Sequence, residues 1–289
     1  MEINGRTRTC GLFGNPVEHT MSPAIHHFLA EKTGQNLAYL PWCVPQGALP
    51  DAVKGALAMD FLGVNVTVPY KSDVIPLLSE VDELAARIGA VNTLVRVGSG
   101  FKGYNTDMPG LYRAMRSDGV TFEGEKFLIL GAGGAARAVA MMLAEKSVKE
   151  IRILNRSFAK ATDVAGEING YLGRELVLPM ELSAWRELPT GERFTVIQAT
   201  NVGMYPKVEE AVIEEPGFYE KVKIGYDLIY NPMETKFMKL VRQSGGEAFH
   251  GFKMLLYQGI LAFELWTGEK ISEELAGLTY AHLLQEMKK

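Results

Sequence analysis

The sequence has little cysteine, no excess of basic residues and no long apolar run. Its 289 residues include only Cys10 and Cys43, too few for a disulfide framework and without the paired spacing of metal or redox motifs. The 30 Lys and Arg residues stand against 34 Asp and Glu, a net charge of -4 that does not favour nucleic acid or an anionic membrane. No window approaches the roughly 18 apolar residues of a membrane span, and the N-terminus lacks the apolar region of a signal peptide. We therefore expect a cytoplasmic protein whose partners are small molecules.

Several sequence patterns that would indicate other classes are also missing. There is no repeat of solenoid period, no low-complexity tract and no coiled-coil heptad. The five histidines show no HExxH or other paired spacing, so we expect no metal. The glycines discussed below are not followed by the Lys-Ser/Thr of a phosphate-binding loop, which argues against nucleotide hydrolysis.

What is present is an alternation of short apolar runs with helix-like segments, which predicts an α/β protein with parallel sheets. The length favours about two domains. Gly, Asn, Asp and Pro cluster at residues 103–110, and a second break at 245–253 precedes the apolar, helix-like MLLYQGILAFELW. We predict one domain from residues 1–106 plus 251–289 and a second from residues 107–250.

The stretch ILGAGGAARAV, residues 129–139, joins an apolar run to an alanine-rich helix through closely spaced glycines. Gly131 would allow a tight turn, Gly133 would let the backbone approach a pyrophosphate, and Ala136 would let the helix pack closely on the strand. The helix N-terminus would offer free N–H groups to phosphate oxygens. The alternative is an ordinary tight turn between a strand and a helix.

The next apolar run, 151–154, ends in Asn155-Arg156-Ser157. An NAD-binding fold would usually place an acidic residue here for the ribose 2′-hydroxyl, and none is present. Arg156, Ser157 and Lys160 instead offer positive charge and a hydroxyl, as a 2′-phosphate requires. The pattern favours NADP, with a solvated basic loop as the alternative.

A second group of polar residues lies in the N-terminal part of the chain. Ser22-Pro23 predicts a helix N-cap followed by proline. In GVNVTVPYK, Asn65 and Thr67 alternate with valines and would lie on the opposite face of a strand. Taken singly, each has a structural explanation: a turn or strand edge for Asn65 and Asn92, a helix cap for Asp107, a surface charge for Lys71.

Taken together, these segments resemble the shikimate dehydrogenase family. The matching segments, in that family's order and across nearly the whole chain, are GNPVEHTMSP, NVTVPYK, GAVNTL, GYNTD, GAGGAARA, NRS, ATNVGM, DLIYNP and GFKMLLYQG. The resemblance implies two domains, an N-terminal mainly parallel α/β/α substrate domain and a Rossmann-type nucleotide-binding domain. It implies NADPH-dependent, reversible reduction of 3-dehydroshikimate to shikimate in aromatic amino acid biosynthesis, by a monomer or homodimer.

The same resemblance assigns roles to individual residues. Lys71 and Asp107 would be the catalytic pair. The substrate would be bound by Thr20, Ser22, Thr67, Asn92, Tyr230 and Gln258. The NADP cofactor would be bound by Gly131, Ala132, Gly133, Gly134, Ala135, Asn155, Arg156, Ser157, Lys160, Thr200 and Gly251.

One departure affects the expected substrate. Position 20 holds Thr where the family commonly has Ser, and the extra methyl group narrows the pocket for the substrate carboxylate. A paralogue acting on quinate or an aminoshikimate is therefore the close alternative. A dinucleotide sensor without catalysis is a further alternative, although it would have no need of the Lys71 and Asp107 pair.

Overall fold

The computed structural model describes residues 3–288, which separate into two compact units. Unit 1 comprises the described residues up to Gly110 and from Leu255 onward, and unit 2 runs from Leu111 to Met254. No helix among the described residues is both long and apolar enough to cross a membrane.

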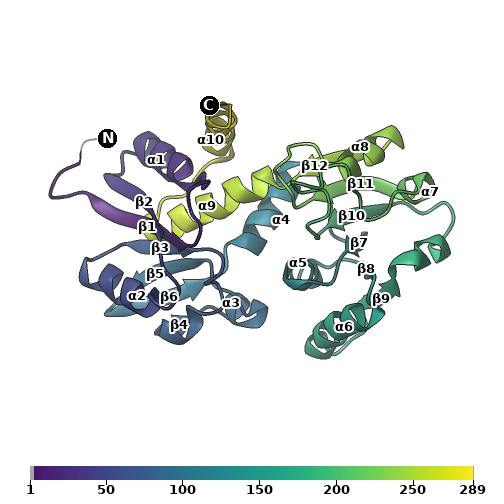
Figure 1. Cartoon of the computed structure of the whole chain (residues 1–289), viewed down its shortest axis with the longest axis horizontal. Coiled ribbons are helices and arrows are strands. Elements are labelled where there is room, and N and C mark those ends of the chain that lie inside the picture. The colour runs from purple at the N-terminus through teal and green to yellow at the C-terminus, as the bar shows by residue number, and fades with distance from the viewer. Residues whose placement is uncertain (1–2, 289) are drawn as a thin grey trace. The chain divides into compact units, whose positions relative to one another are not determined.

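Unit 1 is built on a six-stranded sheet with the strand order β2-β1-β3-β5-β6-β4 (Figure 1). Three of its five pairings are parallel, while β5 runs antiparallel to both of its neighbours. The strands are β1 (Arg8–Gly14), β2 (Leu37–Cys43), β3 (Gly63–Val66), β4 (Glu80–Val81), β5 (Thr93–Val97) and β6 (Gly100–Tyr104). The helical elements are α1 (Ser22–Thr33), α2 (Leu49–Ala58), η1 (Ile75–Leu77), α3 (Glu83–Ile88) and α10 (Glu273–Glu286).

Two longer helices contain the boundaries between the units. These are α4 (Asp107–Ser117) and α9 (Phe252–Thr267), and the latter includes the apolar segment expected to be a helix. The unit 1 part of α9 is anchored on the sheet at Gly63. The Trp266 indole donates to Leu94 O at 2.9 Å, and a Cβ on Gly63 would lie 2.0 Å from the indole nitrogen. Only glycine leaves room for the indole at this point of the sheet.

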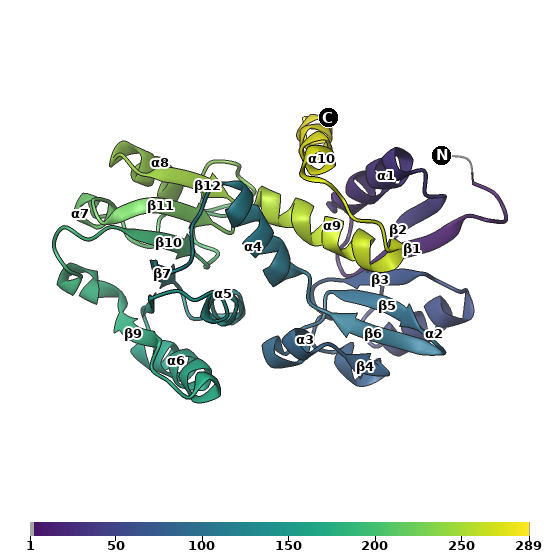
Figure 2. The same ribbon diagram turned by 180° about the vertical axis from the view of Figure 1, so that it is seen from behind.

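Unit 2 contains a fully parallel sheet in the order β12-β11-β10-β7-β8-β9, which can be followed from behind in Figure 2. The strands are β7 (Lys126–Leu130), β8 (Glu150–Asn155), β9 (Val177–Glu181), β10 (Phe194–Gln198), β11 (Val222–Asp227) and β12 (Glu247–His250). The helical elements are α5 (Gly134–Ala144), α6 (Phe158–Leu172), η2 (Leu182–Glu187), α7 (Pro216–Tyr219) and α8 (Lys236–Gln243). This order is that of the doubly wound dinucleotide-binding fold.

The central strand of unit 2 shows why the sequence adopts this topology. Residues 127–130 of β7 are fully buried, as expected of a parallel strand covered on both faces. The helix that follows, α5, buries Ala136 and Ala140 completely, and their small side chains allow a close approach to the sheet. The predicted α/β class, with a Rossmann-type sheet in one unit, is confirmed.

Candidate active site

Lys71 and Asp107 form an ion pair in unit 1. Lys71 lies in the turn that follows β3, and Asp107 is the first residue of α4. Lys71 Nζ donates to Asp107 Oδ2 at 2.6 Å, and the two side chains are 32% and 17% exposed. The carboxylate thus orients an ammonium group that a small ligand can still reach, which is the arrangement required for proton transfer.

Asn92 holds the second oxygen of the same carboxylate. Its Nδ2 donates to Asp107 Oδ1 at 2.8 Å. The orientation of the amide is set on its other side, where Asn92 Oδ1 accepts from the backbone N–H of Thr106 at 2.7 Å. The structure therefore brings Lys71, Asp107 and Asn92 into one contiguous group.

Thr20 and Ser22 lie next to each other at the start of α1. Thr20 Oγ1 donates to Ser22 Oγ at 3.1 Å and accepts the Ser22 backbone N–H at 3.2 Å. The prediction that Ser22 caps this helix is wrong, because α1 begins at Ser22 itself and the cap position, Met21, makes no side-chain hydrogen bond. The reason is that Thr20 already binds the Ser22 N–H, so the chain enters the helix one residue earlier. The Ser22 hydroxyl therefore makes no helix-capping hydrogen bond.

The structure places Thr67 just beyond the predicted strand and Asn65 in its buried interior. The strand β3 ends at Val66, so Thr67 follows it, half-buried, with its N–H donated to Phe13 O. Asn65 lies within the strand and is only 4% exposed, since β3 is buried on both faces. Asn65 is thus an interior residue, whereas Thr67 remains available to a ligand.

Gln258 lies in α9 where this helix meets the first turn of α4. A Cβ on Gly110 would lie 2.6 Å from the Gln258 backbone nitrogen, so the glycine permits the contact. Gln258 Nε2 donates to Leu255 O at 2.8 Å. A second amide proton and the carbonyl oxygen give this side chain the capacity to bind a substrate hydroxyl.

The glycine turn of unit 2 has the conformation that an anion site requires. Gly131 has a φ of +111°, and a Cβ there would lie 2.8 Å from Thr200 Cγ2. Gly133 is the N-cap residue of α5, so no side chain caps this helix. A Cβ on Gly133 would meet no atom within 4 Å, which leaves the space in front of the helix open. Residues 133–135 are exposed, so the α5 N-terminus presents its backbone donors to a ligand.

The basic residues after β8 lie on the same sheet edge as this turn, because β7 and β8 are parallel neighbours. Arg156, Ser157 and Lys160 are all exposed, and within residues 3–288 neither cation forms an ion pair. Ser157 caps α6 by accepting from the Lys160 N–H, which leaves its hydroxyl proton for a ligand. Asn155 Nδ2 donates to Ser157 O at 2.9 Å and holds the loop. This residue set fits a phosphate group and contains no carboxylate that would repel one.

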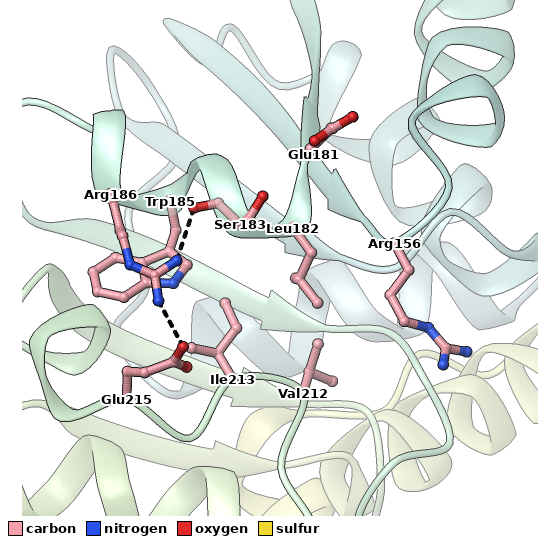
Figure 3. A pocket seen from close by; sticks show the side chains of 9 residues that line it. All are labelled: Arg156, Glu181, Leu182, Ser183, Trp185, Arg186, Val212, Ile213 and Glu215. Atoms are coloured by element: carbon pink, nitrogen blue, oxygen red, sulfur yellow. Dashed lines mark hydrogen bonds and ion pairs between the residues drawn. The ribbon is translucent and has the colours of Figure 1, made fainter.

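A hollow of about 340 Å³ begins at Arg156. Figure 3 shows Arg156 on one side, with Trp185, Arg186 and Glu215 on the other. Arg186 is fixed by an ion pair to Glu215 at 2.8 Å and lies over the Trp185 ring. Leu182, Val212 and Ile213 supply apolar lining between these ends. The volume is within the range of small-molecule sites.

The loops after β10 and β11 carry the remaining unit 2 candidates. Thr200 donates its hydroxyl to Gln198 Oε1 at 2.6 Å, so its proton is used within the turn. Gly251 is buried, and a Cβ there would lie 2.2 Å from Leu228 O, which shows how tightly it packs on the loop before Tyr230. Tyr230 is 38% exposed and belongs to unit 2, whereas the Lys71 group belongs to unit 1.

Asp227, which the sequence did not single out, organises the loop that carries Tyr230. It is fully buried at the end of β11. Its Oδ1 accepts from Ile229 N at 3.0 Å and from Gln198 Nε2 at 3.3 Å, and its Oδ2 accepts from Thr235 Oγ1 at 2.6 Å. Burial raises the pKa of Asp227 to about 6, against the opposing effect of these hydrogen bonds. An acidic residue directly after an apolar strand was the available signal.

Comparison with known proteins places these features in a family. Residues 12–94 match the family model described as the shikimate dehydrogenase substrate binding domain, 114–180 that of shikimate / quinate 5-dehydrogenase, and 251–275 that of the shikimate 5'-dehydrogenase C-terminal domain. The shikimate dehydrogenase (NADP(+)) of Moorella thermoacetica is 42% identical over 272 residues, which cover 93% of this chain and 91% of that protein.

Solved structures agree with these matches. The shikimate 5-dehydrogenase of Thermus thermophilus, in complex with NADP(H) and shikimate, is 33% identical with a TM-score of 0.81, covering 96% of this chain and 100% of that one. The quinate dehydrogenase of Corynebacterium glutamicum, in complex with NAD, is 28% identical with a TM-score of 0.85, covering 96% and 99%. The extent of the match to the Moorella protein, together with an NADP-type residue set on a Rossmann sheet, shows that the chain belongs to the shikimate dehydrogenase family.

Proposed function

We propose that this protein reversibly reduces 3-dehydroshikimate to shikimate with NADPH, the step that serves aromatic amino acid and chorismate biosynthesis. The observation that carries the proposal is the Lys71–Asp107 pair, in which Asn92 holds the second carboxylate oxygen. A protein that only bound a dinucleotide would not require a buttressed, accessible ammonium group in its other unit.

In this proposal Lys71 transfers the proton and Asp107 orients it. Reduction of a ketone leaves negative charge on the carbonyl oxygen, and an ammonium group within hydrogen-bond distance of that oxygen stabilises the charge and donates a proton. In the reverse direction the amine removes the proton from the substrate hydroxyl. NADPH, when bound, supplies the hydride.

Hydroxyl and amide groups hold the substrate. We assign the carboxylate to Thr20 and Ser22, whose hydroxyls lie at the N-terminus of the 12-residue helix α1, where an anion is favoured. We assign the substrate hydroxyls to Thr67, Asn92 and Gln258, and we propose Tyr230 as a further substrate-binding residue. Unit 1 is then the substrate-binding domain and unit 2 the NADP-binding domain.

The cofactor is assigned to the carboxyl edge of the unit 2 sheet. The segment Gly131 to Ala135 binds the pyrophosphate through backbone N–H groups, and Arg156, Ser157 and Lys160 bind the 2′-phosphate, with Asn155 supporting the loop. The hollow beside Arg156 suits the adenine ring, because Leu182, Val212 and Ile213 give it apolar walls. Thr200 and Gly251 shape the two loops beside the proposed cofactor site. Neither offers a free side-chain donor to the cofactor.

The location and assembly state complete the proposal. The two cysteines are both free, one buried and one exposed, which suits a reducing compartment, and we place the enzyme in the cytoplasm. We propose a monomer or a homodimer.

The test combines a substrate and cofactor matrix with a Lys71 variant. Formation of the reduced nicotinamide is followed by its absorbance with shikimate or quinate and NADP⁺ or NAD⁺. Lys71→Ala should lower kcat by orders of magnitude while NADPH binding, measured by fluorescence, is retained. Turnover with NAD⁺ alone would reject the cofactor assignment, and full activity of Lys71→Ala would remove Lys71 from the mechanism.

Quinate is the second candidate substrate, and the reason for considering it is Thr20. Its methyl group alters the carboxylate pocket where the family commonly has serine, and the family includes a quinate dehydrogenase of similar structure. A higher kcat/KM for quinate than for shikimate would establish this alternative, and Thr20→Ser should then shift the ratio toward shikimate.

A further inference from the structure

Tyr39 is a fully buried polar residue that no proposed role yet explains. It lies in β2, and its side chain is 0% exposed. The ring stacks on His26 with 4.2 Å between ring centroids, and Trp266 packs beside both. Phenylalanine would provide the same packing, so the phenolic hydroxyl needs its own explanation, since a buried hydroxyl is costly unless hydrogen-bonded.

The hydroxyl is used to orient Asn65. Tyr39 Oη donates to Asn65 Oδ1 at 2.9 Å. The opposite end of the same amide donates from Nδ2 to Asn92 O at 3.2 Å and to Thr93 Oγ1 at 3.0 Å. All three bonds require the same orientation of the amide, so Asn65 is a fixed link between β2 and β5.

From Asn65 the hydrogen bonds continue to the catalytic pair. Thr93 Oγ1 lies 3.1 Å from Asn92 Oδ1 and 3.1 Å from Thr106 Oγ1. Asn92 in turn donates to Asp107, which holds Lys71. Asn65, Asn92, Thr93 and Thr106 are each at most 4% exposed, so water does not substitute readily for any of these bonds.

We propose that Tyr39 is a positioning residue for the reaction: through Asn65, Thr93 and Asn92 it fixes the orientation of the Lys71–Asp107 pair. This inference rests on the proposed function, because it concerns the pair to which the proton transfer is assigned. His26 acts only as a packing surface, since neither of its ring nitrogens has a hydrogen-bond partner among residues 3–288.

The test is Tyr39→Phe, which removes one oxygen and retains the ring. Asn65 Oδ1 then loses its donor, and kcat/KM for the substrate should fall roughly ten- to hundred-fold because small misplacements of reacting groups are costly. Both kinetic parameters should change: kcat should be lower, and the KM for the substrate should be higher. The KM for NADP⁺ should stay within about two-fold of wild type, since the affected bonds all lie in unit 1.

A double-mutant comparison shows whether Tyr39 acts through Asn65. In an Asn65→Ala background, adding Tyr39→Phe should change kcat/KM by less than about two-fold, because the link is already broken. Full multiplication of the two single effects would overturn the inference. If Tyr39→Phe does not fold, Asn65→Ala alone tests the same link, and wild-type kcat/KM in that variant would overturn the inference.

Tyr257→Phe is the matched control. Tyr257 is also buried in unit 1, and its hydroxyl donates to Glu273 Oε2 at 2.6 Å, away from the Tyr39 to Lys71 chain. This variant should lose similar thermal stability yet keep the wild-type kcat and KM. Equal kinetic losses in both tyrosine variants would reduce Tyr39 to a structural role.

The assay uses whichever of shikimate and quinate the wild type oxidises. A wild-type protein inactive on both would overturn the proposed function and this inference with it. An active wild type whose Tyr39→Phe variant is unchanged would overturn this inference alone.

Discussion

His26 should make the protein lose stability in mild acid. It is completely buried against Tyr39, Phe263 and Trp266, and burial lowers its pKa from 6.5 to about 3. The unfolded chain therefore takes up a proton at this residue below pH 6.5, whereas the folded protein does not until about pH 3. Stability from the neutral ring is complete above pH 6.5 and is lost as the pH falls.

The size of the effect follows from the two pKa values. Between pH 8 and pH 5, the difference in proton binding at His26 lowers the free energy of unfolding by about 2 kcal/mol. His26→Phe removes this contribution without leaving a polar group unpaired, because neither ring nitrogen has a partner among the described residues. Any packing cost of the larger ring is the same at both pH values and cancels.

The assay is urea denaturation of wild type and His26→Phe at pH 8 and pH 5. The difference in unfolding free energy should change by about 2 kcal/mol in favour of the variant at the lower pH. Parallel behaviour of the two proteins over this range would refute the reasoning, since it would mean that the folded protein also protonates His26.

Four further substitutions test unit 2. Asp227→Asn should show the opposite pH dependence: because the folded pKa is raised from 3.8 to about 6, the stability of wild type relative to the variant should fall by about 2 kcal/mol from pH 4 to pH 7, measured in the same urea series. Gly131→Ala should lower stability by roughly 1–3 kcal/mol, because it forces a positive φ and a 2.8 Å contact with Thr200, whereas Gly133→Ala should keep the wild-type melting temperature and weaken only NADPH binding. Arg156→Ala should weaken NADPH binding at least about ten-fold more than NADH binding in fluorescence titrations, and an equal loss for both cofactors would contradict the 2′-phosphate assignment.

Local sequence was sufficient for the elements whose signals are short in range. The β7 run, the glycine turn and the start of α5 are consecutive, so their burial pattern and backbone demands are visible in one window of sequence. The apolar segment of α9 was equally clear, because a helix of that composition needs burial along its length. The prediction of a Ser22 cap was wrong for a local reason too: the hydroxyl of the neighbouring Thr20 accepts the backbone N–H of Ser22, the first residue of the helix.

The contacts that set the candidate site depend on residues far apart in the chain. Tyr39, Asn65 and Thr93 come from three different strands, and nothing in LAYLPWC marks Tyr39 as more than a core aromatic residue. The fixed orientation of Asn92 depends on the Thr106 N–H, 14 positions later. Asp227 has its raised pKa only because the folded protein excludes water from its carboxylate.

The sequence by itself determined the α/β class, the glycine turn before α5, the positive charge at Arg156 and the residue types of the proposed proton-transfer pair. These depend on periodicity, backbone freedom and side-chain chemistry, which are properties of short segments. The tertiary structure alone decided which polar groups are excluded from water and which amides have a single orientation. It also decided which hydroxyl protons have no acceptor within the protein and can be donated to a ligand. Those properties arise when strands distant in sequence pack together and remove water, because burial then makes each hydrogen-bond partner hard to replace.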